Sequence, residues 1–424
     1  MTTDLLSEIA RLLFAFSFYY PLFMAYLWMT GGLYYYLHYE RRDPPPDQPP
    51  PLPHYPPVSI LVPCHNEGRN VEETVAALCE LDYPEFEVLL INDGSTDDTG
   101  ERAEALAQAD ARIRVVHLAR NQGKAVGLNT AAAFARHEYF LCIDGDSLVD
   151  RNSLKWMMRH LLASPRVGAV TGNPRIRTRS TLLGRIQVGE FSSIIGLIKR
   201  AQRTYGKVFT VSGVMACFRR SALHDVGYWN PHALTEDIDV SWRLEIRHWD
   251  VRFEPNALCW ILMPETLQGL WRQRLRWAMG GSQVLLAQFG VLAQWRQRRL
   301  WPIYLEYFTS VAWAYAMAAI VALFIAGLLL ELPEALQIRT LAPGWSGLVI
   351  GTTCLLQFAV SMFLDSRYER GYGRYYYWMI WYPLAYWGLN VCTSVVALPR
   401  VLLRGRKRAT WKSPDRGIRP NEAP

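Results

Sequence analysis

The sequence has little charge and no regular spacing of cysteines. Only 20% of its 424 residues are charged, whereas 50% are hydrophobic, and the hydrophobic residues are concentrated in separate blocks. This distribution excludes one large soluble core and predicts a soluble domain joined to membrane segments. The seven cysteines are odd in number and include no CxxC spacing, which argues against a disulfide framework or a zinc site. We therefore expect the soluble domain to lie in a reducing cytoplasm.

The basic excess gives little support to a nucleic-acid-binding protein. The formal net charge is +7, but much of it lies beside apolar segments, at Arg296, Arg298, Arg299 and the RGRKR run at 404–408. Basic residues next to apolar runs follow the positive-inside pattern. We therefore assign this charge to anionic lipid and membrane topology, and expect no nucleic-acid partner.

Four apolar runs are candidates for the membrane. The first, about 12–37, lacks a small-residue cleavage site and is too long for a signal-peptide core, so we expect an uncleaved span followed by a cytoplasmic loop. The others, 301–330, about 345–364 and 376–398, each reach the ~20 residues needed to cross. Three full crossings would place the basic tail outside, against the positive-inside preference, so we expect 376–398, interrupted by Pro383, to be re-entrant or interfacial.

The order of segments predicts a soluble domain set between membrane parts. Residues 43–57 are rich in proline and favour a stiff extended spacer, with a proline-rich partner ligand as the alternative. The expected parts are an N-terminal transmembrane helix (1–42), the proline-rich linker (43–57), a cytoplasmic catalytic domain (58–262), interfacial amphipathic helices (263–300), a transmembrane channel region (301–400) and a basic tail (401–424).

From Val58 the pattern alternates between strands and helices. Asn70 followed by Glu73 resembles a capping box that opens a helix. Alternation of this kind implies an α/β fold with a parallel, doubly wound sheet that binds ligands at the carboxyl ends of its strands. The predicted strands are 58–62, 86–91, 113–118 and 139–143, and the predicted helices are 70–78, 99–108 and 124–135.

Acidic residues follow two of these strands, in Asn-Asp-Gly and Asp-Gly-Asp sequences. Either motif alone is ordinary turn chemistry, but two at neighbouring strand ends favour a ligand site. We assign Asp146 to a divalent metal that neutralises a diphosphate, and Asp93 and Asp144 to a nucleotide. Lys124, after the third strand, is either a partner for an anionic group or a surface residue.

Two further motifs predict catalysis and acceptor binding. Asp237 in a Thr-Glu-Asp sequence is either part of a helix N-cap or a general base that activates an acceptor hydroxyl; a single direct displacement would then invert the anomeric carbon. In QRLRW, Gln273, Arg276 and Trp277 share a helix face suited to phosphate and to a sugar ring. The alternative is a basic amphipathic helix on the membrane, a role that Arg274 would suit.

Together these motifs resemble those of the processive family 2 glycosyltransferases, which include cellulose, chitin and hyaluronan synthases. Longer stretches, among them TVSGVMACFRRSAL from Thr210, are similar to the bacterial poly-β-1,6-N-acetylglucosamine synthases, and the resemblance runs from about Val58 to Gly417. It implies a GT-A (Rossmann-like) domain between transmembrane helices. Relatives commonly carry two spans before that domain, whereas one is found in this sequence.

The resemblance also implies an activity and a set of partners. UDP-N-acetylglucosamine would be the donor, with Mg²⁺ or Mn²⁺, and the growing polysaccharide would be exported across a bacterial inner membrane into biofilm matrix. Asn66 and Glu67 would help to hold uridine, and Ser212 and Gly213 would lie near the acceptor sugar. A small accessory membrane subunit would assist, and cyclic di-GMP would act at the subunit interface.

Several alternatives stay open on the sequence alone. Arg175 and Arg179 give an RxxxR spacing but lie inside the catalytic region, where substrate contact or surface charge competes with cyclic di-GMP binding. Glu306 would either line a sugar track or lie at the membrane interface. The polymer could instead be chitin-like or hyaluronan-like, the acceptor a lipid phosphate, or the chain a non-catalytic transport or scaffold subunit.

Overall fold

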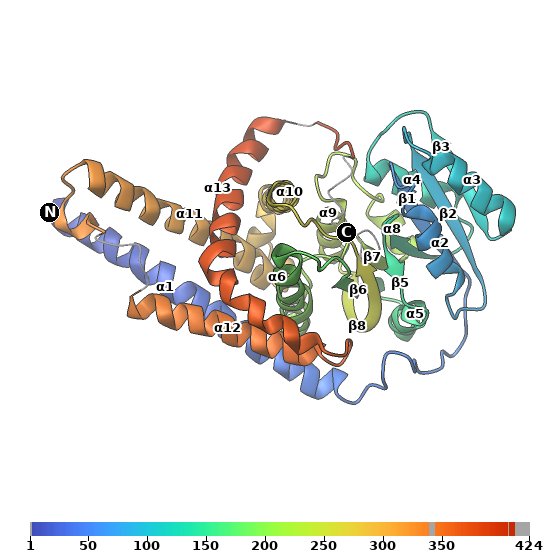
Figure 1. Ribbon diagram of the computed structural model, residues 1–424, viewed down its shortest axis with the longest axis horizontal. Helices are drawn as coiled ribbons and strands as arrows, with labels where there is room; N and C mark the ends of the chain where they lie inside the picture. The colour runs from blue at the N-terminus through green and yellow to red at the C-terminus, as the bar shows by residue number, and fades with distance from the viewer. Residues whose placement is uncertain (1, 339–343, 406, 412–424) are drawn as a thin grey trace.

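The computed structural model describes residues 2–338, 344–405 and 407–411. Figure 1 shows two parts: an α/β body, and long helices that project away from it to one side. Helices α10 (Leu267–Ala287) and α13 (Trp387–Arg404) lie between the two parts. This arrangement places one end of the α/β body against the apolar helices.

One mixed sheet of eight strands forms the body, in the order β3-β2-β1-β4-β7-β6-β8-β5. The pairs β1–β2, β2–β3 and β1–β4 are parallel, as the alternating pattern predicted. Beyond β4 the sheet changes, because β7 runs antiparallel to both β4 and β6 while β6 and β8 are parallel. The strands are β1 (Val58–Cys64), β2 (Phe86–Asp93), β3 (Ile113–Leu118), β4 (Tyr139–Ile143), β5 (Leu148–Val149), β6 (Val167–Ile176), β7 (Met215–Arg219) and β8 (Asp250–Ile261).

Helices cover both faces of this sheet, which is why its central strands are buried throughout. In β1, Ile60 and Val62 pack in the core under α2 and α5, whereas Leu61 packs in the core under α4, α8 and α9. Alternate side chains of a strand point to opposite faces, and full burial of each contributes about 1.5–3 kcal/mol. The covering helices are α2 (Val71–Cys79), α3 (Thr99–Ala109), α4 (Lys124–Phe134), α5 (Ser153–Ala163), α8 (Arg220–Asp225) and α9 (Glu236–Ile246).

The predicted capping box at α2 is wrong. Asn70 precedes the helix but makes no side-chain cap; its amide nitrogen instead donates to Glu67 Oε2 at 2.6 Å. The Glu73 carboxylate accepts two hydrogen bonds from the guanidinium of Arg177, at 2.6 and 2.9 Å. Both side chains are therefore engaged by tertiary partners that the local sequence does not reveal.

Three helices of the described residues are long and apolar enough to cross a membrane. They cover Leu5–Glu40, formed by α1 (Thr2–Tyr35) and the π-helical turn after it, α11 (Trp301–Leu329) and α12 (Trp345–Asp365). The segment 376–398 is no single helix: a 3₁₀ segment (Tyr372–Trp381) and a π-helical turn (Tyr382–Tyr386) precede α13. Its interfacial or re-entrant placement remains a prediction.

The proline-rich linker lies against the α/β body and is not a free spacer. Trp156 of α5 donates from Nε1 to the Pro46 carbonyl at 2.8 Å, and Arg159 pairs with Asp43 at 3.0 Å. Near its end, the Tyr83 hydroxyl donates to the Pro56 carbonyl at 2.7 Å. The linker thus fixes the path from α1 to β1.

A buried ion cluster joins the membrane helices to the body. It contains Arg200 of α7 (Ile198–Tyr205), whose Nε lies 2.7 Å from Glu40 Oε2 and whose Nη1 lies 3.0 Å from Asp365 Oδ1. Arg175 from β6 lies 2.7 Å from the other oxygen of Asp365, and the Tyr368 hydroxyl donates to Glu40. The π-helical turn after α1 and the end of α12 are therefore held to the body by opposite charges.

Candidate active site

A single cavity of about 1370 Å³ connects the α/β body to the apolar helices. At the body its lining includes Asp144, Asp146 and Asp237, and α10 contributes further side chains. At the other end it is lined by residues of the apolar helices and α13, among them Trp28, Glu306, Ile350, Gln357 and Asn390. Acidic groups from distant parts of the sequence thus share one space with the membrane-type helices.

The Asp-Gly-Asp turn follows β4 and brings both of its aspartates to the cavity. Lys124 Nζ lies 2.5 Å from Asp144 Oδ1 and 3.0 Å from Glu236 Oε1, and it donates to the Gly213 carbonyl at 2.9 Å. Burial opposes the charged ammonium, but Asp144 and Glu236 raise the pKa of Lys124 above its ordinary value. Lys124 is therefore a charged member of this centre and not a surface residue.

Asp237 lies in the first turn of α9, where its carboxylate faces the cavity. Its Oδ2 accepts from the Gly213 amide at 3.1 Å, and its Oδ1 accepts from the Ile238 amide at 2.9 Å. Burial, and then the neighbouring charge of Glu236, raise the pKa of Asp237 to about 6. A carboxylate poised near neutral pH is suited to general-base work. Thr235 holds the N-cap position without a side-chain cap, so capping does not account for this motif.

Ser212 and Gly213 form the strand-like segment that holds Asp237 in place. The Ser212 amide donates to Thr171 Oγ1 at 2.7 Å, and Lys199 Nζ donates to the same oxygen at 3.2 Å. Lys199 lines the cavity, and burial lowers its pKa to about 7. Sequence reasoning missed Lys199, because a lone lysine in a helix carries no motif. Glu236 was also missed as a participant, although it stands inside the Thr-Glu-Asp motif.

Asp93, Asn66 and Glu67 make hydrogen bonds that shape the loops after β1 and β2. Both carboxylate oxygens of the fully buried Asp93 accept backbone amides, from Gln122 and Gly123, at 2.8 Å each. Asn66 has a φ of 55° and accepts the Thr96 amide at 2.8 Å.

The Glu67 amide donates to Thr99 Oγ1 at 2.8 Å, so the loop after β1 is tied to the start of α3. None of Asp93, Asn66 and Glu67 lines the cavity just described. Direct contact of these three side chains with a nucleotide remains a prediction.

Helix α10 presents Gln273, Arg276 and Trp277 to the cavity, as the spacing predicted. Trp277 lies beside Phe191, with ring centroids 6.2 Å apart, and under the guanidinium of Arg274, 4.3 Å from the ring centroid. Arg276 is exposed, and its positive charge helps to lower the pKa of Glu236 and limits the rise in the pKa of Asp237. The helix therefore brings a cation and an aromatic ring to the same cavity as the acidic groups.

Arg274 does not lie at an exposed surface, so the alternative membrane-surface role is wrong for this residue. Its side chain is buried and forms an ion pair with the buried Glu190. Its charge is therefore balanced inside the protein by a carboxylate of α6 (Leu182–Phe191).

Arg175 and Arg179 are both engaged inside the protein. Arg175 pairs with Asp365 and lies 4.1 Å from the ring centroid of Tyr372, while Arg179 pairs with Glu369. The RxxxR spacing therefore reflects structural ion pairs near the end of α12.

Among the described residues, no group of three His, Cys, Asp or Glu side chains is arranged to hold a metal by itself. Asp144 and Asp146 nevertheless fit a divalent cation, because Mg²⁺ in enzyme sites is commonly held by one or two carboxylates plus substrate phosphates and water. Their two carboxylates line the same cavity, which leaves room for such a substrate.

Known proteins resemble this chain at the level of family, relatives and fold. The family model for glycosyl transferase family 2 matches residues 59–227. A poly-beta-1,6-N-acetyl-D-glucosamine synthase of Staphylococcus epidermidis is 37% identical over 407 residues, 96% of this chain and 98% of the relative. The protein of the same name from Staphylococcus aureus (strain COL) is 38% identical over 406 residues, 95% of this chain and 98% of the relative.

A solved structure of a mannosyltransferase from Pyrobaculum calidifontis, in complex with GDP-Man and Mn²⁺, matches with a TM-score of 0.64. The match covers 94% of this chain and 99% of that chain at 21% identity. At this identity the likeness shows the fold, which agrees with the expected GT-A domain between apolar helices.

Proposed function

The chain belongs to the family 2 glycosyltransferases, and from this premise we propose that it polymerises N-acetylglucosamine from UDP-N-acetylglucosamine into β-1,6-linked chains. The curated relatives of that name match it over nearly their whole length. The observation that carries the proposal is the single cavity, which has a carboxylate cluster at one end and apolar helices at the other. A polymerase that passes its product into a membrane needs both.

In this proposal Asp237 is the general base. Its carboxylate takes the proton of the acceptor 6-hydroxyl while that oxygen attacks the anomeric carbon, and the bond from that carbon to the UDP oxygen breaks. A pKa of about 6 leaves most Asp237 ionised at neutral pH. The Gly213 amide holds the carboxylate in place. One displacement inverts the anomeric centre, so an α-linked donor gives a β-linkage.

Asp146 is the residue we propose to hold Mg²⁺ or Mn²⁺, and Asp144 beside it is proposed to face the nucleotide. When bound, such a cation neutralises the diphosphate leaving group. Lys124 balances the charge of Asp144 and Glu236, and Arg276 offers a guanidinium to phosphate oxygens. Asp93, Asn66 and Glu67 shape the loops that we propose to receive uridine.

The acceptor end of the growing chain is proposed to lie against α10. Trp277 supplies an aromatic face for a sugar ring, Gln273 adds an amide, and Ser212 and Gly213 form the wall beside Asp237. From there the cavity continues between the apolar helices, past Glu306, which we propose as part of the export route to biofilm matrix.

We propose that the protein lies in a bacterial inner membrane with its α/β body in the cytoplasm. The proposal is supported by Arg296, Arg298 and Arg299 just before α11, because the positive-inside preference favours a cytoplasmic start for that helix. A small accessory membrane subunit, with cyclic di-GMP acting at its interface, remains part of the proposal. Since Arg175 and Arg179 are already paired, they are poor candidates for that dinucleotide.

Product analysis tests the proposed function. The purified membrane protein is incubated with UDP-N-acetylglucosamine and Mg²⁺, and the product is digested with a hydrolase specific for β-1,6-linked poly-N-acetylglucosamine. We expect a polymer that this enzyme degrades. A product that resists it, or a requirement for a second UDP-sugar, contradicts the proposed polymer and favours a chitin-like or hyaluronan-like one.

A further inference from the structure

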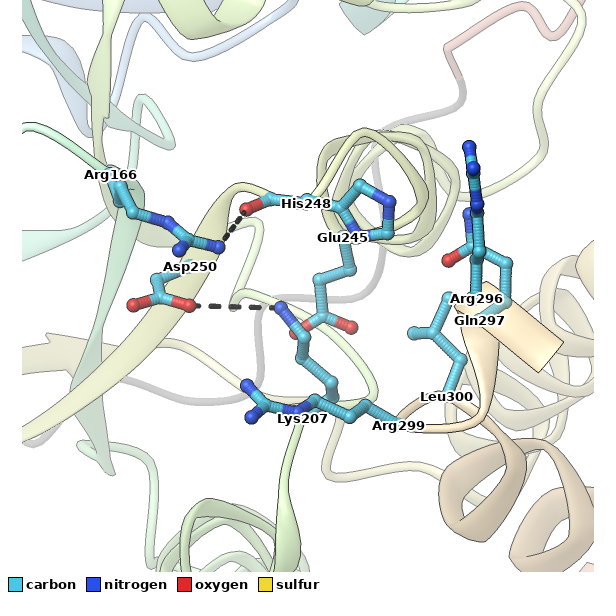
Figure 2. A pocket seen from close by; sticks show the side chains of 9 residues that line it. All are labelled: Arg166, Lys207, Glu245, His248, Asp250, Arg296, Gln297, Arg299 and Leu300. Atoms are coloured by element: carbon cyan, nitrogen blue, oxygen red, sulfur yellow. Dashed lines mark hydrogen bonds and ion pairs between the residues drawn. The ribbon is translucent and has the colours of Figure 1, made fainter.

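A second, smaller pocket of about 40 Å³ lies away from the large cavity, and its lining is unusually basic (Figure 2). Four cationic side chains line it together with two carboxylates, so it carries a net positive charge. The lining residues are Arg166, Lys207, Glu245, His248, Asp250, Arg296, Gln297, Arg299 and Leu300.

The acidic groups of this pocket do not cancel its cations. Asp250 lies between Lys207 and Arg252, 3.8 Å from each. Burial raises the pKa of Glu245 to about 8, so at neutral pH this carboxyl is mostly protonated and can donate a hydrogen bond. The Arg296 and Arg299 guanidinium groups have no ion pair within the part of the chain that the structure describes.

Glu245 also supplies an unused polar atom. Its side chain is 1% exposed, its Oε1 accepts the Val208 amide at 3.1 Å, and its Oε2 is buried without a hydrogen-bond partner among the described residues. A buried polar atom without a partner costs about 1–3 kcal/mol. In Figure 2 the Glu245 carboxyl and the Lys207 ammonium lie together at the centre, and the Arg299 side chain passes below Lys207.

The pocket adjoins the membrane end of the molecule. Arg299 and Leu300 immediately precede the apolar helix α11, so the pocket lies where lipid headgroups are expected. The same segment carries Trp295 and Phe289, which are 68% and 67% exposed, as aromatic residues at a membrane interface often are.

We propose that this pocket binds a phosphate group, either in the headgroup of an anionic lipid or as a free anion. Arg166, Lys207 and Arg299 supply charge-assisted donors from three separate segments, which is the chemistry that phosphate oxygens require. A divalent cation is excluded by the net positive charge. The volume, enough for a few water molecules, fits a phosphate group and excludes a sugar nucleotide.

A phosphate group bound in this pocket would connect the membrane surface to Asp237, the proposed base. Glu245 lies in the last turn of α9, and Asp237 lies in its first turn, about 12 Å away along the helix axis for eight residues at 1.5 Å each. Lys207 and Val208 begin the segment that leads to Gly213, whose amide binds Asp237. A bound phosphate would therefore tie the start of α11 to both elements that position Asp237.

The test measures binding without requiring turnover, so it stands apart from the proposed function. The full chain is placed in nanodiscs of phosphatidylcholine, either with phosphatidylglycerol or with inorganic phosphate at constant ionic strength, and its unfolding temperature is recorded. Stabilisation by phosphatidylglycerol alone identifies a lipid headgroup, and stabilisation by inorganic phosphate identifies a free anion. No stabilisation by either overturns the proposal.

Arg299→Gln and Arg298→Gln form a matched pair for this test. Both remove one charge from the same exposed segment, but Arg298 stacks on Trp295 and does not line the pocket. We expect Arg299→Gln to need roughly tenfold more ligand for the same stabilisation, since one charge-assisted hydrogen bond is lost, and Arg298→Gln to behave as the natural protein. If both variants lost ligand stabilisation equally, the effect would come from general surface charge, and the proposed phosphate site would be wrong.

Glu245→Gln separates a phosphate site from a cation site. The amide keeps a donor for a phosphate oxygen and keeps an acceptor for the Val208 amide, so we expect binding to persist. Loss of binding in this variant, with its fold intact, would mean that the pocket needs a carboxylate charge, and would contradict the proposal.

Discussion

At the scale of single residues, neighbouring groups of the acidic centre differ in pKa. Glu236 is kept ionised by Lys124, and its charge together with burial raises the pKa of Asp237 to about 6. Two adjacent carboxylates thus have different tasks, since one pairs with a lysine and the other stays available to accept a proton.

The first prediction concerns the base. Replacing Asp237 with Asn should lower kcat by roughly 10²–10⁴-fold, because the acceptor hydroxyl loses its proton acceptor. In the natural protein the rate should fall as pH drops through about 6, where Asp237 becomes protonated, and should level off above pH 7. Initial rates of sugar transfer against pH measure both effects.

Asp239→Asn is the control for Asp237→Asn. Asp239 lies in the same turn of α9 but pairs with Arg243 at 2.7 Å and does not line the cavity. We expect this variant to keep its pH profile. If Asp237→Asn also kept full activity, Asp237 would not be the base.

The second prediction concerns the metal. Asp146→Asn should raise the Mg²⁺ or Mn²⁺ concentration for half-maximal transfer by at least tenfold, since changes to outer-shell partners alone cost about 10–100-fold. Chelation with EDTA should abolish transfer in the natural protein, and added metal should restore it. Asp150 does not line the cavity, so the Asp150→Asn variant should need the same metal concentration as the natural protein. If activity were unchanged after full chelation, the proposed metal would be ruled out.

At the scale of elements, α10 and the helices before it join the soluble and apolar parts through buried charge. The α6 to α7 segment carries Glu190, which pairs with Arg274 of α10, and Arg200, which pairs with the ends of α1 and α12. Such pairs do not by themselves add much stability, but removing one partner leaves an uncompensated buried charge.

The third prediction follows from this asymmetry. Arg200→Met should destabilise the protein by about 3–5 kcal/mol, because Glu40 and Asp365 lose their shared cation. Thermal unfolding in detergent would show a lowered midpoint. As a control, Arg11→Gln removes an exposed ion pair with Glu8 and should change stability by less than about 0.5 kcal/mol. If Arg200→Met and Arg11→Gln had similar effects, the buried ion cluster would not hold the helices to the body.

At the scale of the whole molecule, the cavity is the feature that relates synthesis to the membrane. No single element forms it, since its lining comes from the sheet end, α9, α10 and the apolar helices. A substitution that narrows the cavity far from the carboxylates should therefore reduce release of long polymer without stopping sugar transfer.

The fourth prediction is made on that basis. Ile350→Trp would fill part of the cavity between the apolar helices, and should reduce long polymer while transfer to a short acceptor persists. Product length by gel analysis, beside transfer rates, measures the separation. Leu348→Trp is the matched control, because Leu348 lies on the same helix, is 58% exposed and does not line the cavity. If both variants gave polymer of normal length, the part of the cavity between the apolar helices would not be the export route.

Local pattern was enough to predict the elements of the first half of the sheet. The predicted bounds of the strands at 113–118 and 139–143 agree with the structure to the residue, because short segments rich in β-branched and aromatic residues between turns favour strands. The helical spacing of Gln273, Arg276 and Trp277 was likewise enough to place them on one face. The motifs pointed to Asp144, Asp146 and Asp237 for the same reason, as short polar sequences at element ends.

Tertiary structure decided what these side chains meet. The sequence alone could not show that Glu73 pairs with Arg177 rather than capping α2, that Arg274 is buried against Glu190, or that Lys199 lies beside the segment holding Asp237. The sequence alone also could not predict that β7 pairs with β4 in the antiparallel direction. Each of these contacts joins residues that are far apart in the chain, so it forms only when the chain has folded. The periodicity of strands and helices, by contrast, is already present in a few neighbouring residues.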